Sequence, residues 1–204
     1  MLKKKINRKN ILNFLICIFP LSFIFGNLII NIEIVLISLL GVFIYKSNIF
    51  FFDNKKIIIV LFSFFLLLVI STTLYHNFNL ENSQVIKSVL FIRYFIFFLV
   101  VGTVVKNQDF NFKYFSLTCF LITIFLSVDI IFQNYVGVNL FGYNQHTNHN
   151  SSVFRDELIA GGYMQKFCLI GLIFLTFISN KFSRILLYMS FSIFILGIGI
   201  FFSG

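Results

Sequence analysis

Charged side chains inside long apolar stretches are the residues of this sequence whose type and position predict chemistry. A charge in the hydrocarbon of a bilayer costs about 2.5 to 3.5 kcal/mol on insertion scales, so a charge kept there tends to mark a functional site. We expect these ionisable side chains in the outer half of the bilayer or at its rim: Glu33, Arg93, Asp129, Arg155, Asp156, Glu157 and Lys166. If they converge, they line a polar cavity that opens outward and could bind a substrate.

The two arginines among them are suited to an anionic ligand. A guanidinium at the start of a helix can bind two phosphate oxygens, and the free N–H groups of the helix add to the positive field. Arg155 stands at such a position, directly before Asp156 and Glu157. Arg93 is expected deeper in the membrane, so the two guanidinium groups could bind different oxygens of one diphosphate. This pattern assigns no catalytic residue.

A structural interpretation of the same charges stays open. Glu33 and Asp129 could neutralise Arg93 inside the helix bundle, because buried charges are normally paired. The 156–157 pair could cap the following helix, where the two carboxylates would offset its dipole. Lys166 could extend its ammonium group to the lipid headgroups without touching a substrate.

The sequence lacks the motifs of a metal or cofactor site. His146 and His149 are spaced i, i+3 in an asparagine-rich run, but no third ligand has suitable spacing, so we expect a solvated loop. Cys17, Cys119 and Cys168 each lie in an apolar stretch, at an odd count and without metal-ligand spacing. No Gly-rich phosphate loop, nucleophile elbow or zinc-helix motif is present. We therefore expect no metal and no cofactor.

The composition assigns the chain to the integral membrane proteins. Of its 204 residues 59% are hydrophobic and 11% are charged, and the mean hydropathy is +0.96, which no soluble domain of this size could bury in one core. Stretches close to the ~20 residues that cross the hydrocarbon predict an all-α, polytopic bundle of about seven transmembrane helices. We expect these helices at 11–25, 28–45, 57–74, 85–105, 114–134, 158–179 and 185–202, in a single transmembrane domain 1–204 with an outer loop at 135–157.

The basic residues predict the orientation of the chain. A net charge of +9 would suit nucleic acid, but the lysines and arginines are concentrated before the first apolar stretch and in alternate loops. That distribution follows the positive-inside rule and places the N-terminus in the cytoplasm. We therefore expect the lipid bilayer as a partner and no nucleic acid. In a Gram-negative cell the chain would lie in the inner membrane, with the outer loop in the periplasm.

Two runs around the outer loop resemble the bacterial O-antigen ligase and O-antigen polymerase family. The first has the spacing of the family's Asp-x-x-x-Gln-x-x-x-Gly-x-x-Leu-x-Gly run, with Asp129, Gln133, Gly137, Leu140 and Gly142. The second, 151–163, is similar to the small-Gly-x-Phe-x-Asp-Glu-x-x-x-Gly-x-Tyr signature, with Ser152 where the family has glycine. The last two residues match the start of the family's Ser-Gly-Glu-Arg run.

The resemblance implies a multi-span glycosyltransferase that uses an undecaprenyl-diphosphate-linked glycan and no metal. Cationic side chains would hold the diphosphate at the outer membrane face, and the glycan would pass to lipid A-core in a ligase or to an acceptor glycan in a polymerase. Positive groups placed there would stabilise the charge that develops on the leaving diphosphate. In the family, a large outer loop with the catalytic His and Arg follows the Ser-Gly-Glu-Arg run, and so would follow Gly204 here. The resemblance therefore also implies the N-terminal part of a longer protein.

Two other interpretations stay open. Intramembrane charges and an outward cavity also suit a transporter or flippase for a lipid-linked or anionic saccharide, although paired halves and Gly/Pro-broken spans are not visible. Without the later loop, the chain could also be an inactive, truncated remnant. The sequence thus predicts a membrane protein of lipid-linked glycan chemistry and leaves its enzymatic activity open.

Overall fold

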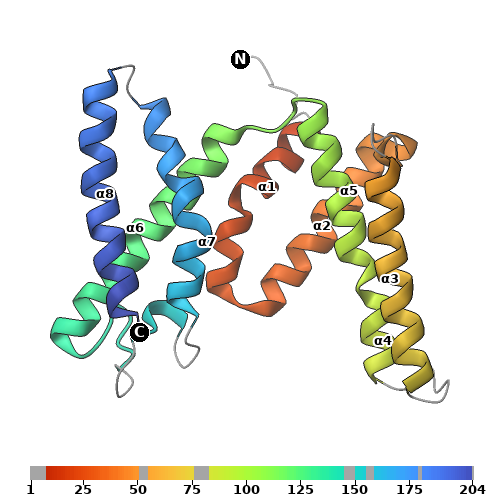
Figure 1. Ribbon diagram of the computed structural model, residues 1–204, viewed down its shortest axis with the longest axis horizontal. Helices are drawn as coiled ribbons and strands as arrows, with labels where there is room; N and C mark the ends of the chain where they lie inside the picture. Colours follow the sequence, from red (N-terminus) through yellow and green to blue (C-terminus); the bar gives the residue numbers. More distant parts are fainter. Residues whose placement is uncertain are drawn as a thin grey trace, which may run out of the picture. The chain divides into compact units, whose positions relative to one another are not determined.

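The computed structural model describes residues 8–50, 55–75, 83–144, 150–154, 159–178 and 181–203, which are helical apart from loops and one isolated antiparallel bridge. The α-helices are α1 Arg8–Phe25, α2 Asn27–Tyr45, α3 Lys55–Tyr75, α4 Ser83–Leu90, α5 Ile92–Lys106, α6 Phe112–Val136, α7 Ala160–Ile173 and α8 Phe182–Phe202 (Figure 1). Short 3-10 turns are η1 Lys46–Phe50, η2 Ser152–Phe154 and η3 Phe174–Phe177. Seven helical segments are long and apolar enough to cross a membrane. The predicted all-helical, multi-span architecture is confirmed.

The helices form two compact units. Unit 1 comprises Met1–Ile16 and Asn27–Phe110, and unit 2 comprises Cys17–Gly26 and Asn111–Gly204. Helix α1 contributes to both units and continues through Pro20 to Phe25. Gly26 then adopts a φ of +92°, an angle that glycine reaches without the steric cost of a side chain. This single residue makes the tight turn between α1 and α2.

Unit 1 is built on the contact between α2 and α5, where Gly41 of α2 lies against the side chain of Val100. A missing Cβ lets two transmembrane helices approach closely. Helix α3 packs against α4 and α5, and none of the residues in its apolar window is buried within the chain. Most of the α3 surface is therefore available to lipid or to another helix.

The fourth predicted span corresponds to one apolar segment, Ser83–Lys106, which contains two helices where one was expected. The sequence predicts one helix over 85–105, whereas α4 and α5 are separated at Phe91. The Phe91 N–H is shared between the carbonyls of Lys87 and Ser88, both at 3.2 Å. A donor shared between the i−3 and i−4 carbonyls marks a local tightening of the helix. No glycine or proline marks this position, so the sequence gives no signal of the break.

Unit 2 is organised around α6, which packs against both α7 and α8 (Figure 1). A Cβ built on Gly171 of α7 would lie 2.8 Å from the Cα of Phe120 on α6, and one built on Gly199 of α8 would lie 2.7 Å from the Cβ of Ser127. Such close approach at small residues is typical of packed membrane helices. The fully buried apolar side chains of this unit include Leu126, Ile130 and Met164.

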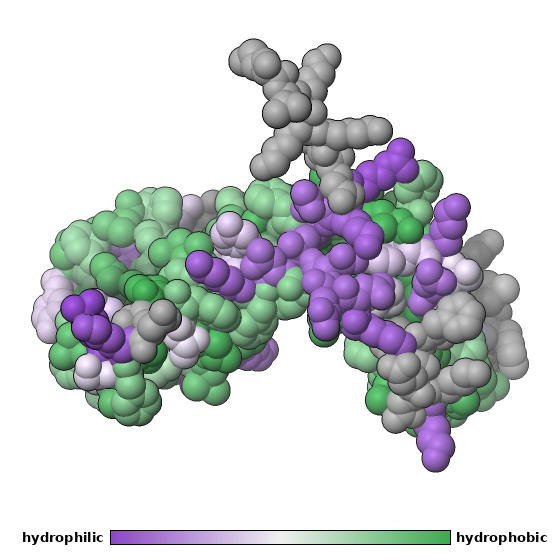
Figure 2. All heavy atoms as spheres, turned by 90° about the horizontal axis from the view of Figure 1, so that it is seen from above, coloured by the Kyte–Doolittle hydropathy of each residue, from purple (hydrophilic) through white to green (hydrophobic). Residues whose placement is uncertain are grey.

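Basic residues lie at corresponding ends of the helices in each unit. In unit 1 these are Arg8, Lys9, Lys46, Lys56 and Lys106, and in unit 2 Lys113, Lys181 and Arg184. The view in Figure 2 shows hydrophilic side chains gathered at helix ends and hydrophobic ones over the flanks. This is the distribution expected of helices whose flanks face lipid.

Candidate functional site

The segment after α6 begins with a tight loop folded by its own side chains. Gly137 ends α6 in the left-handed conformation, φ +85°, and its N–H donates to the carbonyl of Gln133 at 2.9 Å. The side-chain oxygen of Asn139 accepts the N–H groups of Phe141 at 3.0 Å and Tyr143 at 2.8 Å. Asn139 is itself buried. It therefore satisfies backbone donors that would otherwise lack a partner.

Ser152, at the far side of this loop, is held at all three of its polar groups. Its N–H donates to Oε1 of Gln133 at 2.9 Å, its carbonyl accepts from Nδ2 of Asn139 at 2.7 Å, and its hydroxyl donates to the carboxylate of Asp129. Ser152 is fully buried and has a φ of +52°, which is uncommon for a residue with a side chain. Such a conformation persists where the surroundings over-determine it, as these three bonds do.

Asp129 lies in α6 and is fully buried. Its Oδ1 accepts the N–H of Leu140 at 2.9 Å, and its Oδ2 accepts the hydroxyl of Ser152. Hydrogen bonds to an ionised carboxylate are stronger than those between neutral groups. The geometry therefore supports a structural role, in which Asp129 fastens the two sides of the loop to α6.

Two cavities adjoin this loop in unit 2. The large cavity, of about 840 Å³, is mostly apolar, and its lining includes Leu21, Phe25, Leu121, Phe125 and Phe141. The Lys166 cavity, of about 280 Å³, is lined by Lys166 with Ile159, Gly162, Tyr163 and Phe167. Phe23 and Phe154 line both cavities. An apolar cavity and a cation-bearing one thus share an aromatic wall.

The Lys166 cavity combines one cation with several aromatic rings. The ring centres of Tyr163 and Phe167 are 4.6 Å apart, and those of Phe23 and Phe167 are 5.5 Å apart. The hydroxyl of Tyr163 donates to the carbonyl of Pro20 at 2.8 Å. Lys166 is exposed, and no ion pair joins it to a residue that the structure describes. Its ammonium group is therefore available to an anion.

No protein-family model, no curated protein and no solved structure matches this chain. Its function is therefore inferred from the side chains that each unit brings together.

The expected site residues are divided between the units. Glu33 and Arg93 belong to unit 1, and Asp129 and Lys166 belong to unit 2. The guanidinium of Arg93 lies 5.0 Å from the centre of the Tyr94 ring and donates to its hydroxyl at 3.3 Å. Among the described residues Arg93 forms no ion pair, and its Nε is buried without a partner. Within unit 1 the described side chains form no ion pair between Arg93 and Glu33, the partner that the structural interpretation allows there.

The remaining expected site residues, and the two histidines, lie outside the described residues: Arg155, Asp156, Glu157, His146 and His149. Helix α7 begins at Ala160, two residues later than the predicted start, and its N-cap residue is Ile159, which makes no side-chain cap.

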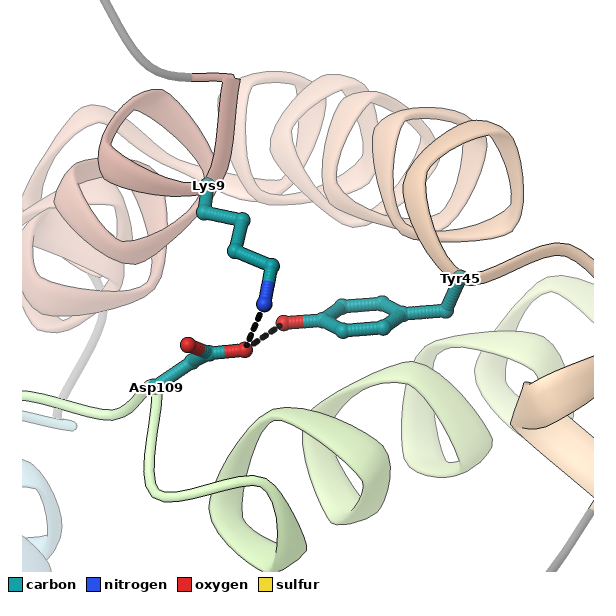
Figure 3. A network of polar contacts seen from close by, with 3 residues as sticks. All are labelled: Lys9, Tyr45 and Asp109. Carbon is teal, nitrogen blue, oxygen red and sulfur yellow. Dashed lines mark hydrogen bonds and ion pairs between the residues drawn. The ribbon is translucent and has the colours of Figure 1, made fainter.

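A charged cluster that the sequence analysis missed joins three helix ends in unit 1 (Figure 3). The Nζ of Lys9 and the hydroxyl of Tyr45 both donate to Oδ2 of Asp109, at 2.9 Å and 2.7 Å. Burial alone would raise the pKa of Asp109, but the hydrogen bonds from Lys9 and Tyr45 and the charge of Lys9 lower it below the ordinary value. The available signal was an acidic residue, Asp109, in a loop that otherwise carries the basic residues Lys106 and Lys113.

The sequence analysis also missed the residues that shape the cavities. Phe23, Phe154 and Tyr163 are contributed by α1, η2 and α7. With 32 phenylalanines in the chain, residue type alone could not separate these rings from those that face lipid. Asn139, a polar residue two positions after the helix-ending Gly137, was the clearer signal of an ordered loop.

Proposed function

We propose that this chain binds an undecaprenyl-diphosphate-linked glycan of the O-antigen type at the outer face of the inner membrane, and takes part in its transfer to lipid A-core or to another glycan. The observation that carries the proposal is the shared wall in unit 2. Phe23 and Phe154 line both the apolar large cavity and the cavity that holds Lys166. A lipid diphosphate has the matching halves, an apolar chain and an anionic head.

The large cavity suits the prenyl chain. Several of its lining side chains are exposed and apolar, including Leu121 at 58% and Phe141 at 60%. A chain could therefore enter from the lipid, and each methylene removed from water contributes about 0.8 kcal/mol. A chain already in lipid gains less, so this cavity orients the substrate more than it tightens binding.

The Lys166 cavity suits the diphosphate. An ammonium group near the leaving diphosphate would stabilise the charge that develops on it during transfer. Arg155, expected near the start of the helix that carries Lys166, would add a guanidinium group able to bind two phosphate oxygens. The basic helix ends support the orientation that this role needs, because the positive-inside rule places them in the cytoplasm and the loop after α6 outside.

A transporter or flippase is the second candidate, and one observation favours it. The span formed by α4 and α5 is locally tightened at Phe91, and such a tightening within a helix often marks a hinge, which transport would need. Movement of a labelled lipid diphosphate across proteoliposomes without any acceptor glycan would support this candidate. A lipid that binds but stays in its leaflet would support the transferase role.

The test of the proposed function compares two lipids that differ in charge. Purified full-length chain in nanodiscs is titrated with undecaprenyl diphosphate and with the neutral alcohol undecaprenol. Lys166→Gln is expected to weaken diphosphate binding about tenfold, the equivalent of one charge-assisted hydrogen bond. Binding of undecaprenol should stay unchanged, and Lys166→Arg should retain most of the diphosphate affinity.

Lys113→Gln is the matched control, since Lys113 is an exposed lysine at the start of α6 in the same unit. It should change neither affinity. Equal affinities of the wild type for the two lipids, or an equal loss in the Lys113 and Lys166 variants, would contradict the proposal.

A further inference from the structure

Ser152 begins a single 3-10 turn, η2, that ends at Phe154. One turn of helix is not stable by itself, because too few hydrogen bonds offset the ordering of its backbone. Within the turn, the N–H of Phe154 donates to the carbonyl of Ser151 at 3.1 Å. The position of η2 must therefore be set by bonds to the rest of unit 2, and those bonds converge on Ser152.

The bonds at Ser152 come from two separate parts of unit 2. Asp129 and Gln133 lie one turn apart on α6, and Asn139 lies in the loop that follows α6. Together they fix the hydroxyl, the N–H and the carbonyl of one fully buried residue. Three bonds in three directions leave the start of η2 little freedom to shift.

Phe154 is where this fixed turn meets the cavities. Its side chain is 8% exposed, its ring centre lies 5.7 Å from that of Tyr163, and it lines both the large cavity and the Lys166 cavity. A shift of η2 would move this ring and change the wall that the two cavities share. The buried bonds at Ser152 thus act on the cavities through Phe154.

We infer that Ser152 is a positioning residue, which places Phe154 as the wall that guides a lipid diphosphate to Lys166. The inference rests on the proposed function and adds a residue that does not touch the lipid itself. Asp129, Gln133 and Asn139 act through Ser152, and Ser152 acts through Phe154. Distortion of the backbone at Ser152 should therefore weaken diphosphate binding without removing any group that contacts the diphosphate.

The test uses Ser152→Ala, Phe154→Leu and the double variant in the full-length chain. Alanine loses the hydroxyl bond and keeps the unfavourable φ of +52°. Ser152→Ala is expected to weaken binding of undecaprenyl diphosphate in nanodiscs about fivefold, as a small change in the geometry of a binding site would. Phe154→Leu should weaken it to a similar extent. The double variant should lose no more than either single variant, because both changes disturb the same wall.

Ser152→Gly keeps the experiment interpretable if the alanine variant does not fold. Glycine accepts the positive φ and loses only the hydroxyl bond, so its affinity should lie between those of wild type and Ser152→Ala. Thr176→Ala removes a hydroxyl that bonds only the carbonyl of Ile173 three residues earlier, and it serves as the control. It should leave the diphosphate affinity unchanged.

Two results would overturn the inference. One is a lower unfolding temperature in Ser152→Ala with an unchanged diphosphate affinity, which would make the network purely structural. The other is a double variant whose loss equals the product of the single losses, which would show that Ser152 does not act through Phe154. Neither is confused with failure of the proposed function, which would show as unchanged diphosphate binding in Lys166→Gln.

Discussion

Two polar clusters, one around Asp109 in unit 1 and one around Asp129 in unit 2, each join distant parts of the chain, and they are built differently. In unit 1, Lys9 and Asp109 form an ion pair whose side chains are 45% and 24% exposed. In unit 2, the fully buried Asp129 binds an N–H and a hydroxyl and has no cationic partner among its hydrogen bonds. The cluster around Asp109 contains more charged side chains, whereas the cluster around Asp129 is more deeply buried.

The comparison shows that burial, more than the number of charges, decides how strongly a polar cluster stabilises a membrane protein. Water and salt screen an exposed ion pair, whose contribution is about 0 to 1 kcal/mol. A buried donor that loses its acceptor costs about 1 to 3 kcal/mol, because nothing replaces the lost bond. The cluster around Asp129 should therefore contribute more to stability than the one around Asp109.

The largest effect is expected for Asp129→Ala. This change leaves the N–H of Leu140 and the hydroxyl of Ser152 without their acceptor, and we expect a loss of about 3 kcal/mol in the free energy of unfolding. Equilibrium unfolding in detergent and SDS mixtures measures it. Asp109→Ala, studied in parallel, should lose less than half as much. An equal or larger loss from Asp109→Ala would reverse the comparison between the units.

A second prediction tests the close packing of α8 on α6 in unit 2. Gly199→Ala places a Cβ within 2.8 Å of the Ser127 backbone, whereas Gly197, two residues earlier on α8, has nothing within 4 Å of its Cβ position. Gly199→Ala should destabilise by about 1 to 3 kcal/mol through overpacking. Gly197→Ala should be neutral or slightly stabilising, since alanine favours the helix. Similar melting temperatures of the two variants would contradict the packing of α8 on α6.

Element type and length were the predictable part of this fold. A run of about 20 apolar residues needs internal hydrogen bonds in lipid and so becomes a helix. The seven spans are confirmed on that basis, with ends that shift by a few residues. The break at Phe91 was not predictable, because it depends on a shared N–H rather than on a glycine or proline.

The site was less predictable, because a helical sequence gives the depth of a residue but not its partners. Counting along the spans places Arg93 and Asp129 at similar depths, yet they belong to different units. The partners of Asp129 are a backbone N–H and a serine hydroxyl, groups that no charge pattern reveals. Ser152 adopts a φ of +52°, a backbone conformation that favours glycine, so its residue type alone does not predict its place in this network.

The smallest effect is expected for Asp109→Asn, and it carries a pH dependence. Because the pKa of Asp109 lies below its ordinary value of 3.8, the folded protein binds this proton less readily than the unfolded chain. The stabilisation is therefore complete above about pH 4 and is lost as the pH falls through the lower, folded pKa. At pH 7, Asp109→Asn should cost no more than about 1 kcal/mol, since Lys9 is half exposed. Once the pH has fallen below the folded pKa of Asp109, the wild type and the variant should unfold at nearly the same temperature in detergent. A difference between them that does not shrink at any acid pH would mean that the hydrogen-bond geometry, rather than the charge, stabilises this cluster.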